Sequence, residues 1–201
     1  MAKNVWLIRH AKQESLGSVR QVGGWQPEAE LAPESTDRIK AASEYFIERG
    51  IHFSFMAHSG LIRSRQTAQR LRDLIGGGVV PIHLFEGLGP GEIGEWEERF
   101  SKFIERQPDP ENPPLLRADE IESLFPDLCA REGERVLGAT KEIALRLEEG
   151  GSAGAVSHFP LIQLAESLVT GNPVRPNLGY CQAICFTFES EEVVGCEAHL
   201  Y

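Results

Sequence analysis

The same order of residues occurs three times along this chain: a short apolar run, then an arginine or a histidine, then a helical pattern or a turn. The runs are residues 5–8, 53–57 and 153–156, and the polar residues that follow them are Arg9 with His10, then Arg63, then His158. A short apolar run before a helix is typical of a buried strand in a parallel sheet. Because the carboxyl ends of parallel strands meet at one edge, where α/β proteins bind ligands, we expect these four residues to lie together.

The residue types at this edge suit a phosphate ligand. Arginine offers a fixed fork of N–H donors that matches phosphate oxygens. His10 can act on phosphorus as a nucleophile, or serve as a ligand or as an acid/base. Arg63 lies in the first turn of a helical pattern, where a cation opposes the helix dipole unless an anion binds there. The alternatives are that Arg63 is a solvated helix residue and that His158 only caps the helix that follows it.

Taken together, the three blocks resemble the histidine phosphatase superfamily, which also contains the phosphoglycerate mutases. The resemblance rests on Leu7-Ile8-Arg9-His10-Ala11, on Ser-x-Leu-x-Arg-x-x-Gln-Thr-Ala over residues 59–68, and on Val156-Ser157-His158 before a helix that ends at residues 168–171. The second block is the most specific, because several positions match together. The resemblance implies one domain over residues 1–201, a three-layer α/β/α sandwich with a mostly parallel central sheet and a small insertion over the active site.

The family resemblance also implies a role for each of the four residues. His10 attacks phosphorus and becomes a phosphohistidine, His158 polarises the phosphoryl oxygens, and Arg9 and Arg63 neutralise their charge. Phosphoryl transfer needs in-line positioning and fixed positive charge, which this set supplies without a metal or other cofactor. The attacking imidazole must be neutral, and flanking arginines lower its pKa from the usual ~6.5. We expect a carbonyl to hold its other ring nitrogen, so that one tautomer persists.

The family's proton donor is harder to place, because the match is weaker between residues 86 and 97. Gly94-Glu95-Trp96-Glu97 resembles the family's Gly-x-Trp-Glu string, and alignment with a two-residue deletion puts Glu92 at the donor position. Glu86 is the second candidate, as donor or substrate contact. The alternative is that both are solvated loop carboxylates.

Two further residues are expected to bind substrate: Ser59, which is otherwise a turn residue, and Phe159. Phe159 and Pro160 replace the glycines that usually follow the second histidine, and Ala11 replaces the more common glycine after the first. Phe159 keeps a backbone N–H that can donate to an oxyanion, whereas Pro160 has none. The Phe159 ring either narrows the pocket or packs into the core.

Composition restricts the class of partner. The formal net charge of −10 argues against nucleic acid and an anionic membrane surface. No apolar stretch approaches the length of a membrane span, and Met1 leads almost directly into the first apolar run, so no signal peptide is expected. The four cysteines have no Cys-x-x-Cys spacing, so we expect buried reduced thiols and a cytoplasmic protein. The oligomeric state is left open.

The stretch 97–132 favours hydrolysis over mutase activity. It is expected to form a cap-like insertion over the site, with five Lys or Arg against ten Asp or Glu. An acidic cover is a poor clamp for a second phosphate. We therefore expect a phosphatase acting on a small phosphomonoester or a phosphorylated protein side chain. The alternatives are a phosphate-binding regulatory protein, a mutase-type phosphotransferase, and a metal-assisted phosphohydrolase, which the scatter of Asp and His disfavours.

Further elements follow from periodicity and from glycine and proline positions. We expect helices over residues 34–49, 134–149 and 161–169, and a helical pattern after the second block with Ala68, Leu71, Leu74 and Ile75 on one face. We expect a strand over residues 79–84 and two terminal strands, 182–189 and 193–200, that form an antiparallel edge. Residues 13–33, which include Trp25, are expected to form a loop.

Overall fold

A computed structural model describes residues 1–14, 30–106 and 116–201 of the chain. Its centre is a six-stranded sheet in the order β3-β2-β4-β1-β5-β6. The four strands β3, β2, β4 and β1 run parallel, β5 is antiparallel to β1, and β6 is antiparallel to β5. The strands are β1 (Lys3–Arg9), β2 (Phe55–His58), β3 (Ile82–Leu84), β4 (Ser152–Ser157), β5 (Ala183–Glu189) and β6 (Glu192–His199). The sheet is therefore mostly parallel, with the expected antiparallel edge.

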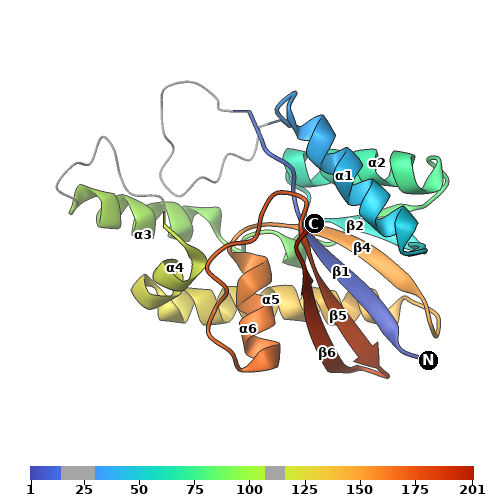
Figure 1. The fold of residues 1–201 in the computed structure, drawn as a ribbon. Helices are drawn as coiled ribbons and strands as arrows, with labels where there is room; N and C mark the ends of the chain where they lie inside the picture. The colour runs from blue at the N-terminus through green and yellow to red at the C-terminus, as the bar shows by residue number, and fades with distance from the viewer. Residues whose placement is uncertain (15–29, 107–115) are drawn as a thin grey trace.

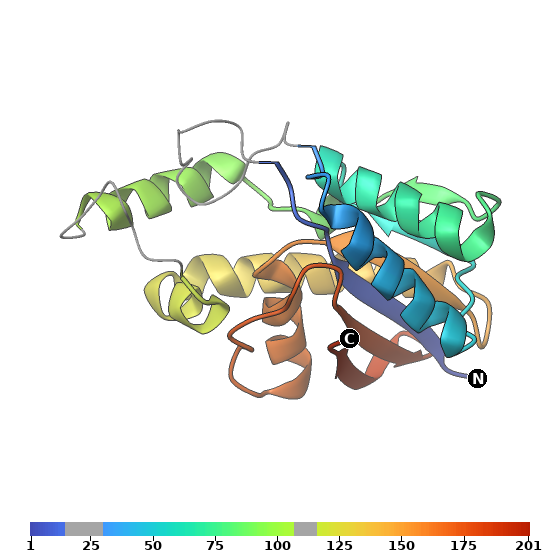
Figure 2. The same cartoon turned by 45° about the horizontal axis from the view of Figure 1, so that its top comes forward.

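Helices cover both faces of this sheet (Figure 1). One face carries α1 (Ser35–Glu48) and α2 (Ile62–Gly76). The other carries α5 (Pro126–Leu145) and α6 (Leu161–Thr170). Figure 2 shows α3 (Ile93–Glu105) extending away from the sheet, with α4 (Ala118–Leu124) beside one end of α5. The architecture is the expected α/β fold, with the central sheet between two helical layers.

Strand β1 shows why a sheet in this position needs a continuous apolar run. Val5 and Leu7 pack into the core under α5 and α6, whereas Trp6 and Ile8 pack into the core under α1. Successive side chains of a strand point to opposite faces, so burial on both faces requires every residue to be apolar. The run Val5-Trp6-Leu7-Ile8 meets this requirement, which is why it was recognisable in the sequence.

Two element boundaries differ from the sequence prediction. The strand expected from residue 79 begins at Ile82, because Val79 is exposed and Pro81 has no N–H and contributes only its carbonyl, to the Met56 N–H. The helix expected from residue 134 begins eight residues earlier, at Pro126. Proline suits the first helical position, and Leu128 is buried among the core residues.

The stretch 97–132, expected as an insertion, therefore includes most of α3, all of α4 and the first residues of α5. Trp96 and Phe100 of α3 and Ile121 of α4 are buried in the core under α5 and α6. Trp25 and most of the loop expected over residues 13–33 lie outside the described residues.

The state of the cysteines and the length of the helices can both be compared with the sequence predictions. All four cysteines are free thiols; three are buried and Cys196 is partly buried. Burial raises the pKa of each, to about 12 for Cys129, so these thiols are not activated nucleophiles. In residues 1–14, 30–106 and 116–201, each helix is too short or too polar to cross a membrane.

Candidate active site

The parallel strands end at one edge of the sheet and bring the candidate residues together there. Arg9, the last residue of β1, is paired with Ser157 of β4, and His58, the last residue of β2, is paired with Val156. The residues that follow these strand ends, His10, Ser59 and His158, therefore enter the same space. The ring centroids of His10 and His158 are 5.0 Å apart, tilted by 52°.

His10 is held in one orientation by both ring nitrogens. Its Nδ1 lies 2.7 Å from the Ala11 carbonyl oxygen, and its Nε2 accepts a hydrogen bond from the Arg63 Nε at 3.2 Å. A carbonyl can only accept, so Nδ1 carries the proton and Nε2 keeps its lone pair. The expected contact to a carbonyl is present. The His10 side chain is only 7% exposed, so the ring is buried although it follows the end of a strand.

The electrostatic environment keeps the His10 ring neutral. Burial is the largest cause of a pKa well below its ordinary value, and the Arg63 and Arg9 cations lower it further. The Ala11 carbonyl opposes them, because it favours a protonated ring. At neutral pH Nε2 is therefore unprotonated, and its lone pair, which accepts from Arg63 Nε, becomes available when that donor turns to an anionic ligand.

His158 is fully buried beside this ring. Its Nε2 is 2.6 Å from the Ser59 hydroxyl oxygen, within hydrogen-bond distance. Burial again is the main cause of a pKa well below the ordinary value, followed by His10, Arg63, Arg135 and Arg9. With no anion bound, the site therefore holds two neutral imidazoles, and a phosphate dianion would offset the arginine charge that keeps them neutral.

The two arginines are buried to different extents. Arg63 is 1% exposed, and burial lowers the pKa of its guanidinium to about 10, which leaves it charged at neutral pH. Arg9 is partly buried and donates from Nη1 to the Leu178 carbonyl. No carboxylate in the described part of the chain forms an ion pair with Arg9. Its cation is therefore available to an anionic ligand.

Aromatic rings flank the Arg9 guanidinium. The Phe159 ring centroid is 5.0 Å from its central carbon, and the Tyr180 centroid is 4.2 Å away. Arginine stacks well on aromatic faces, so the two rings fix the plane of its donors. Phe159 thus contacts Arg9 and also packs against the core.

Tyr180 was not predicted from the sequence. Its ring centroid is also 6.0 Å from that of His10. The segment that carries it is tied to the end of β1, because the Cys181 N–H donates to the Arg9 carbonyl and the Arg9 N–H to the Gln182 carbonyl, both at 2.9 Å. The antiparallel pairing of β5 with β1 creates this proximity, and no local sequence signal indicates it.

Three polar residues of the second motif join the blocks to one another. The Thr67 hydroxyl accepts from the Ala11 N–H at 3.1 Å and donates to the Arg63 carbonyl at 2.7 Å. The Ser64 hydroxyl accepts from the Ser59 N–H at 3.1 Å and donates to the Val156 carbonyl at 2.8 Å. The side-chain oxygen of Gln66 accepts from the Leu31 N–H at 2.9 Å. The motif therefore positions the candidate residues as well as supplying Arg63.

The two candidate proton donors lie on a turn next to this cluster. Glu86 begins the 3-10 helix η2 (Glu86–Leu88), and Glu92 immediately precedes α3; both side chains are exposed. The turn packs on the site, since the Ser157 hydroxyl donates to the Leu88 carbonyl at 2.5 Å. The hydrogen bonds and ion pairs of the described residues do not join either carboxylate to His10 or His158. The structure thus places the turn beside the site without selecting between the carboxylates.

The remaining histidine near the site, His58, has a local role. It is buried, and its Nδ1 accepts from the Gly60 N–H at 3.0 Å, which shapes the turn after β2. Residues 1–14, 30–106 and 116–201 contain no group of three or more His, Cys, Asp or Glu arranged to hold a metal ion.

The fold and this cluster define the class of protein. The model of the histidine phosphatase superfamily, branch 1, matches residues 5–192. The chain therefore belongs to the histidine phosphatase superfamily, whose members are phosphatases or phosphotransferases. Comparison with curated proteins found no match in sequence.

Solved structures share the fold at low sequence identity. YhfR of Bacillus stearothermophilus is 21% identical with a TM-score of 0.68, over 98% of this chain and 95% of that one. A mycobacterial glucosyl-3-phosphoglycerate phosphatase is 16% identical with a TM-score of 0.67, over 98% and 97%. The protein histidine phosphatase SixA, complexed with tungstate, is 13% identical with a TM-score of 0.60, over 98% and 94%. At these identities the likeness is one of fold.

Proposed function

We propose that this protein is a phosphatase that hydrolyses a phosphomonoester or a phosphorylated side chain through a phosphohistidine on His10. The observation that carries the proposal is the His10 ring, neutral and oriented by the Ala11 carbonyl, with Arg63 3.2 Å from Nε2. A neutral, fixed nucleophile beside buried cations is the combination that phosphoryl transfer to nitrogen requires.

In the first step the lone pair of His10 Nε2 forms a bond to phosphorus, opposite the leaving oxygen. The bond from phosphorus to that oxygen breaks, its electron pair stays on oxygen, and a nearby acid donates a proton there. Arg9 and Arg63 neutralise the phosphoryl oxygens, and His158, oriented by Ser59, polarises them. The proton on Nδ1 stays on the ring, where its hydrogen bond to the Ala11 carbonyl stabilises the positive charge that develops.

In the second step water attacks phosphorus and the bond to Nε2 breaks. The acid that donated its proton is now a carboxylate and takes one from the attacking water, so that inorganic phosphate leaves and His10 is neutral again. We propose Glu92 as this acid, because the alignment with a two-residue deletion puts it at the family's donor position. Glu86 is the second candidate, and both residues lie on the turn that packs against the site.

A phosphate-binding protein with little turnover is the second candidate function. The observation that favours it is the exposure of both carboxylates, neither of which forms a hydrogen bond or ion pair with the described residues of the cluster. A mutase-type phosphotransferase is the weaker alternative, because the stretch 97–132 has ten acidic residues against five basic ones.

For the substrate we propose a phosphorylated small molecule or a phosphorylated protein in the cytoplasm, bound by a single-domain protein. The net charge of −10 supports neither nucleic acid nor an anionic membrane as partner. The structural relatives described as a glucosyl-3-phosphoglycerate phosphatase and as a protein histidine phosphatase suggest the substrate classes to test.

The test combines turnover with trapping of the intermediate. The wild type is screened against sugar phosphates, phosphohistidine peptides and an aryl phosphate, and is then mixed briefly with labelled substrate and denatured. We expect a phosphoenzyme that is labile in acid and stable in base. His10→Ala should lose the label and turnover, with binding of phosphate measured as a control for the site. Substantial turnover by His10→Ala would contradict the proposal.

A further inference from the structure

An ion pair on α5, between a buried carboxylate and a partly buried guanidinium, binds the turn that carries both candidate proton donors. Glu132 and Arg135 lie one helical turn apart, and the Glu132 Oε2 is 2.5 Å from the Arg135 Nη2. Glu132 is only 3% exposed. A carboxylate this deeply buried needs a partner, and Arg135 supplies it.

The pair also binds the backbone of the turn at three places. Arg135 donates from Nη1 to the Glu86 carbonyl at 3.3 Å and from Nη2 to the Gly89 carbonyl. The Glu132 carboxylate accepts from the Gly91 N–H, at 3.0 Å to Oε2. One ion pair thus connects α5 to the beginning, the middle and the end of the segment 86–91.

The opposite side of the turn rests on the candidate active site. A Cβ atom added to Gly89 would lie 3.1 Å from the Cβ of Ser59, the residue whose hydroxyl contacts His158. A Cβ atom added to Gly91 would lie 2.6 Å from the Glu132 carboxylate. Glycine at these two positions lets the turn fit between the ion pair and Ser59.

We propose that Glu132 and Arg135 are positioning residues, which hold the turn between Glu86 and Glu92 so that its proton donor faces the leaving oxygen. This inference rests on the proposed phosphatase function. Burying the Glu132 carboxylate costs it its hydration, so this ion pair is an inefficient source of stability. A carboxylate and a guanidinium fork can, however, satisfy a backbone N–H and two carbonyls simultaneously and with fixed geometry.

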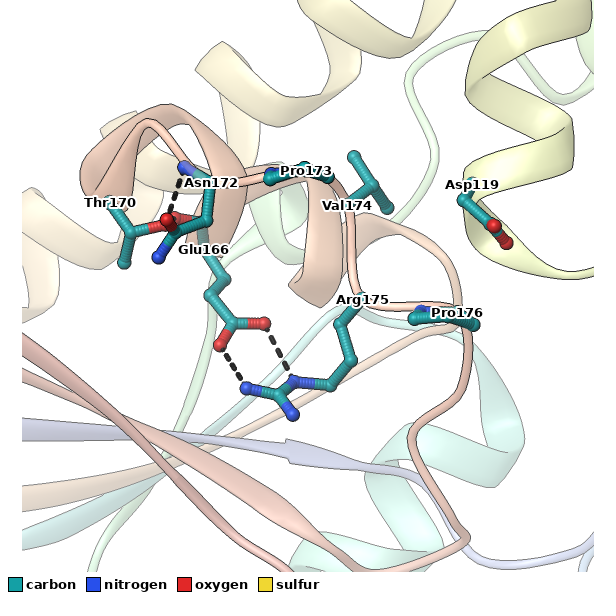
Figure 3. Close-up of a pocket in the computed structure, with 8 residues that line it drawn as sticks. All are labelled: Asp119, Glu166, Thr170, Asn172, Pro173, Val174, Arg175 and Pro176. Carbon is teal, nitrogen blue, oxygen red and sulfur yellow. Dashed lines mark hydrogen bonds and ion pairs between the residues drawn. The ribbon is translucent and has the colours of Figure 1, made fainter.

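A second ion pair in the same protein provides a matched control. Arg175 donates to the Glu166 carboxylate at 2.6 and 3.0 Å, and Glu166 is 8% exposed. The pair lines a pocket of about 350 Å³ between α6, the segment that follows it and Asp119 of α4. Figure 3 shows the two residues of the pair, Glu166 and Arg175, facing each other there. Its groups bind each other and make no recorded contact with the turn 86–92, so its loss should affect stability without moving the proton donor.

The test compares leaving groups in Arg135→Lys and Arg175→Lys. Lysine keeps the positive charge that lowers the pKa of His158 together with burial, but one ammonium cannot replace the fork. An alkyl phosphate needs a proton donor, an effect of about 10²–10⁴-fold, whereas an activated aryl phosphate needs little help. We expect Arg135→Lys to lower kcat for the alkyl phosphate by about 10–100-fold, and for the aryl phosphate by less than about threefold.

A second variant guards against a simple loss of folding. Glu132→Gln should give the same selective loss, and the double variant with Arg135→Lys should be no worse than the more affected single variant, because the two residues act on one turn. Arg175→Lys should lower kcat for neither substrate. Equal losses on both substrates, or an alkyl-selective loss in Arg175→Lys, would overturn the inference.

Hydrogen exchange of the backbone amides separates this inference from the proposed function, because it needs no turnover. We expect faster exchange at Gly89 and Gly91 in Arg135→Lys, with unchanged protection in α6 and in the strands. If the wild type hydrolyses neither substrate, the proposed function fails whatever the exchange shows. If the wild type is active and the turn keeps its protection in the variant, the positioning role is wrong.

Discussion

Replacing Arg63 with methionine tests the charge arrangement at the site most directly. Methionine is unbranched and adapts to an arginine-sized space, but it carries neither charge nor donors. The hydrogen bond from the Thr67 hydroxyl to the Arg63 carbonyl involves only backbone at residue 63, so it should remain. The contact to His10 Nε2 is lost.

The magnitude follows from the distance. Arg63 Nε is 3.2 Å from the nitrogen that would receive the phosphoryl group, so guanidinium and phosphoryl oxygen would meet at hydrogen-bond range. Two unit charges about 4 Å apart at an effective dielectric constant of ~20 interact by about 4 kcal/mol. Losing one preorganised donor to developing charge costs about 2.7–4 kcal/mol, so we expect kcat to fall by about 10²–10³-fold.

The pH profile provides an independent readout. His10 reacts as the neutral ring, so activity is lost as pH falls through its pKa. Burial is the main cause of the lowered pKa and Arg63 is the second, so removing Arg63 raises it while leaving it below the ordinary value. The acid limb of kcat/KM, which reports the free enzyme, should therefore move to higher pH in Arg63→Met.

Steady-state kinetics from pH 4.5 to 9 on one aryl phosphate measure both effects, with thermal unfolding as a check on folding. Arg63→Lys is the matched control, because it keeps the charge and should leave the acid limb near its wild-type position. A kcat for Arg63→Met within threefold of the wild type, or an acid limb that does not move, would refute this account of the site.

Three further predictions concern the reaction. Chelator should leave the rate unchanged, because Arg9 and Arg63 supply the positive charge; a large loss restored by magnesium or manganese would assign the protein to the metal-assisted class. With 3-phosphoglycerate, isomerisation to 2-phosphoglycerate should be negligible beside phosphate release from a good phosphomonoester, and efficient isomerisation would show that the acidic stretch 97–132 was misinterpreted. Glu92→Gln should reduce hydrolysis of an alkyl phosphate by about 10²-fold or more while sparing an aryl phosphate, whereas Glu86→Gln should change both little; the reverse pattern would exchange their roles, and no selective effect in either would favour the phosphate-binding alternative.

The sequence alone indicated the sheet and the four residues at its edge. A strand buried on both faces needs a continuous apolar run, and three such runs precede His10, Arg63 and His158. Parallel pairing of these strands then brings their carboxyl ends together regardless of loop detail. The boundaries of α1 and α6 were also close to prediction, because apolar periodicity and glycine or proline signals coincide at their ends.

Features that depend on contacts between distant segments could not be predicted from the sequence. Tyr180 reaches Arg9 because β5 pairs with β1, across about 170 residues of chain. Arg135 and Glu132 bind the turn 86–91 because α5 packs against η2. The sequence prediction missed the first eight residues of α5, which begins at Pro126, because charged residues interrupt the apolar periodicity before residue 134.

The two kinds of information differ for a physical reason. Burial on both faces of a strand and the turn into a helix N-terminus are conditions that each segment must satisfy locally, so they leave a local pattern in the sequence. The depth of His10, the pKa of its ring and the placing of the proton donor depend on which side chains from other segments fill the remaining space. Packing at close distances decides those, and only the tertiary structure contains it.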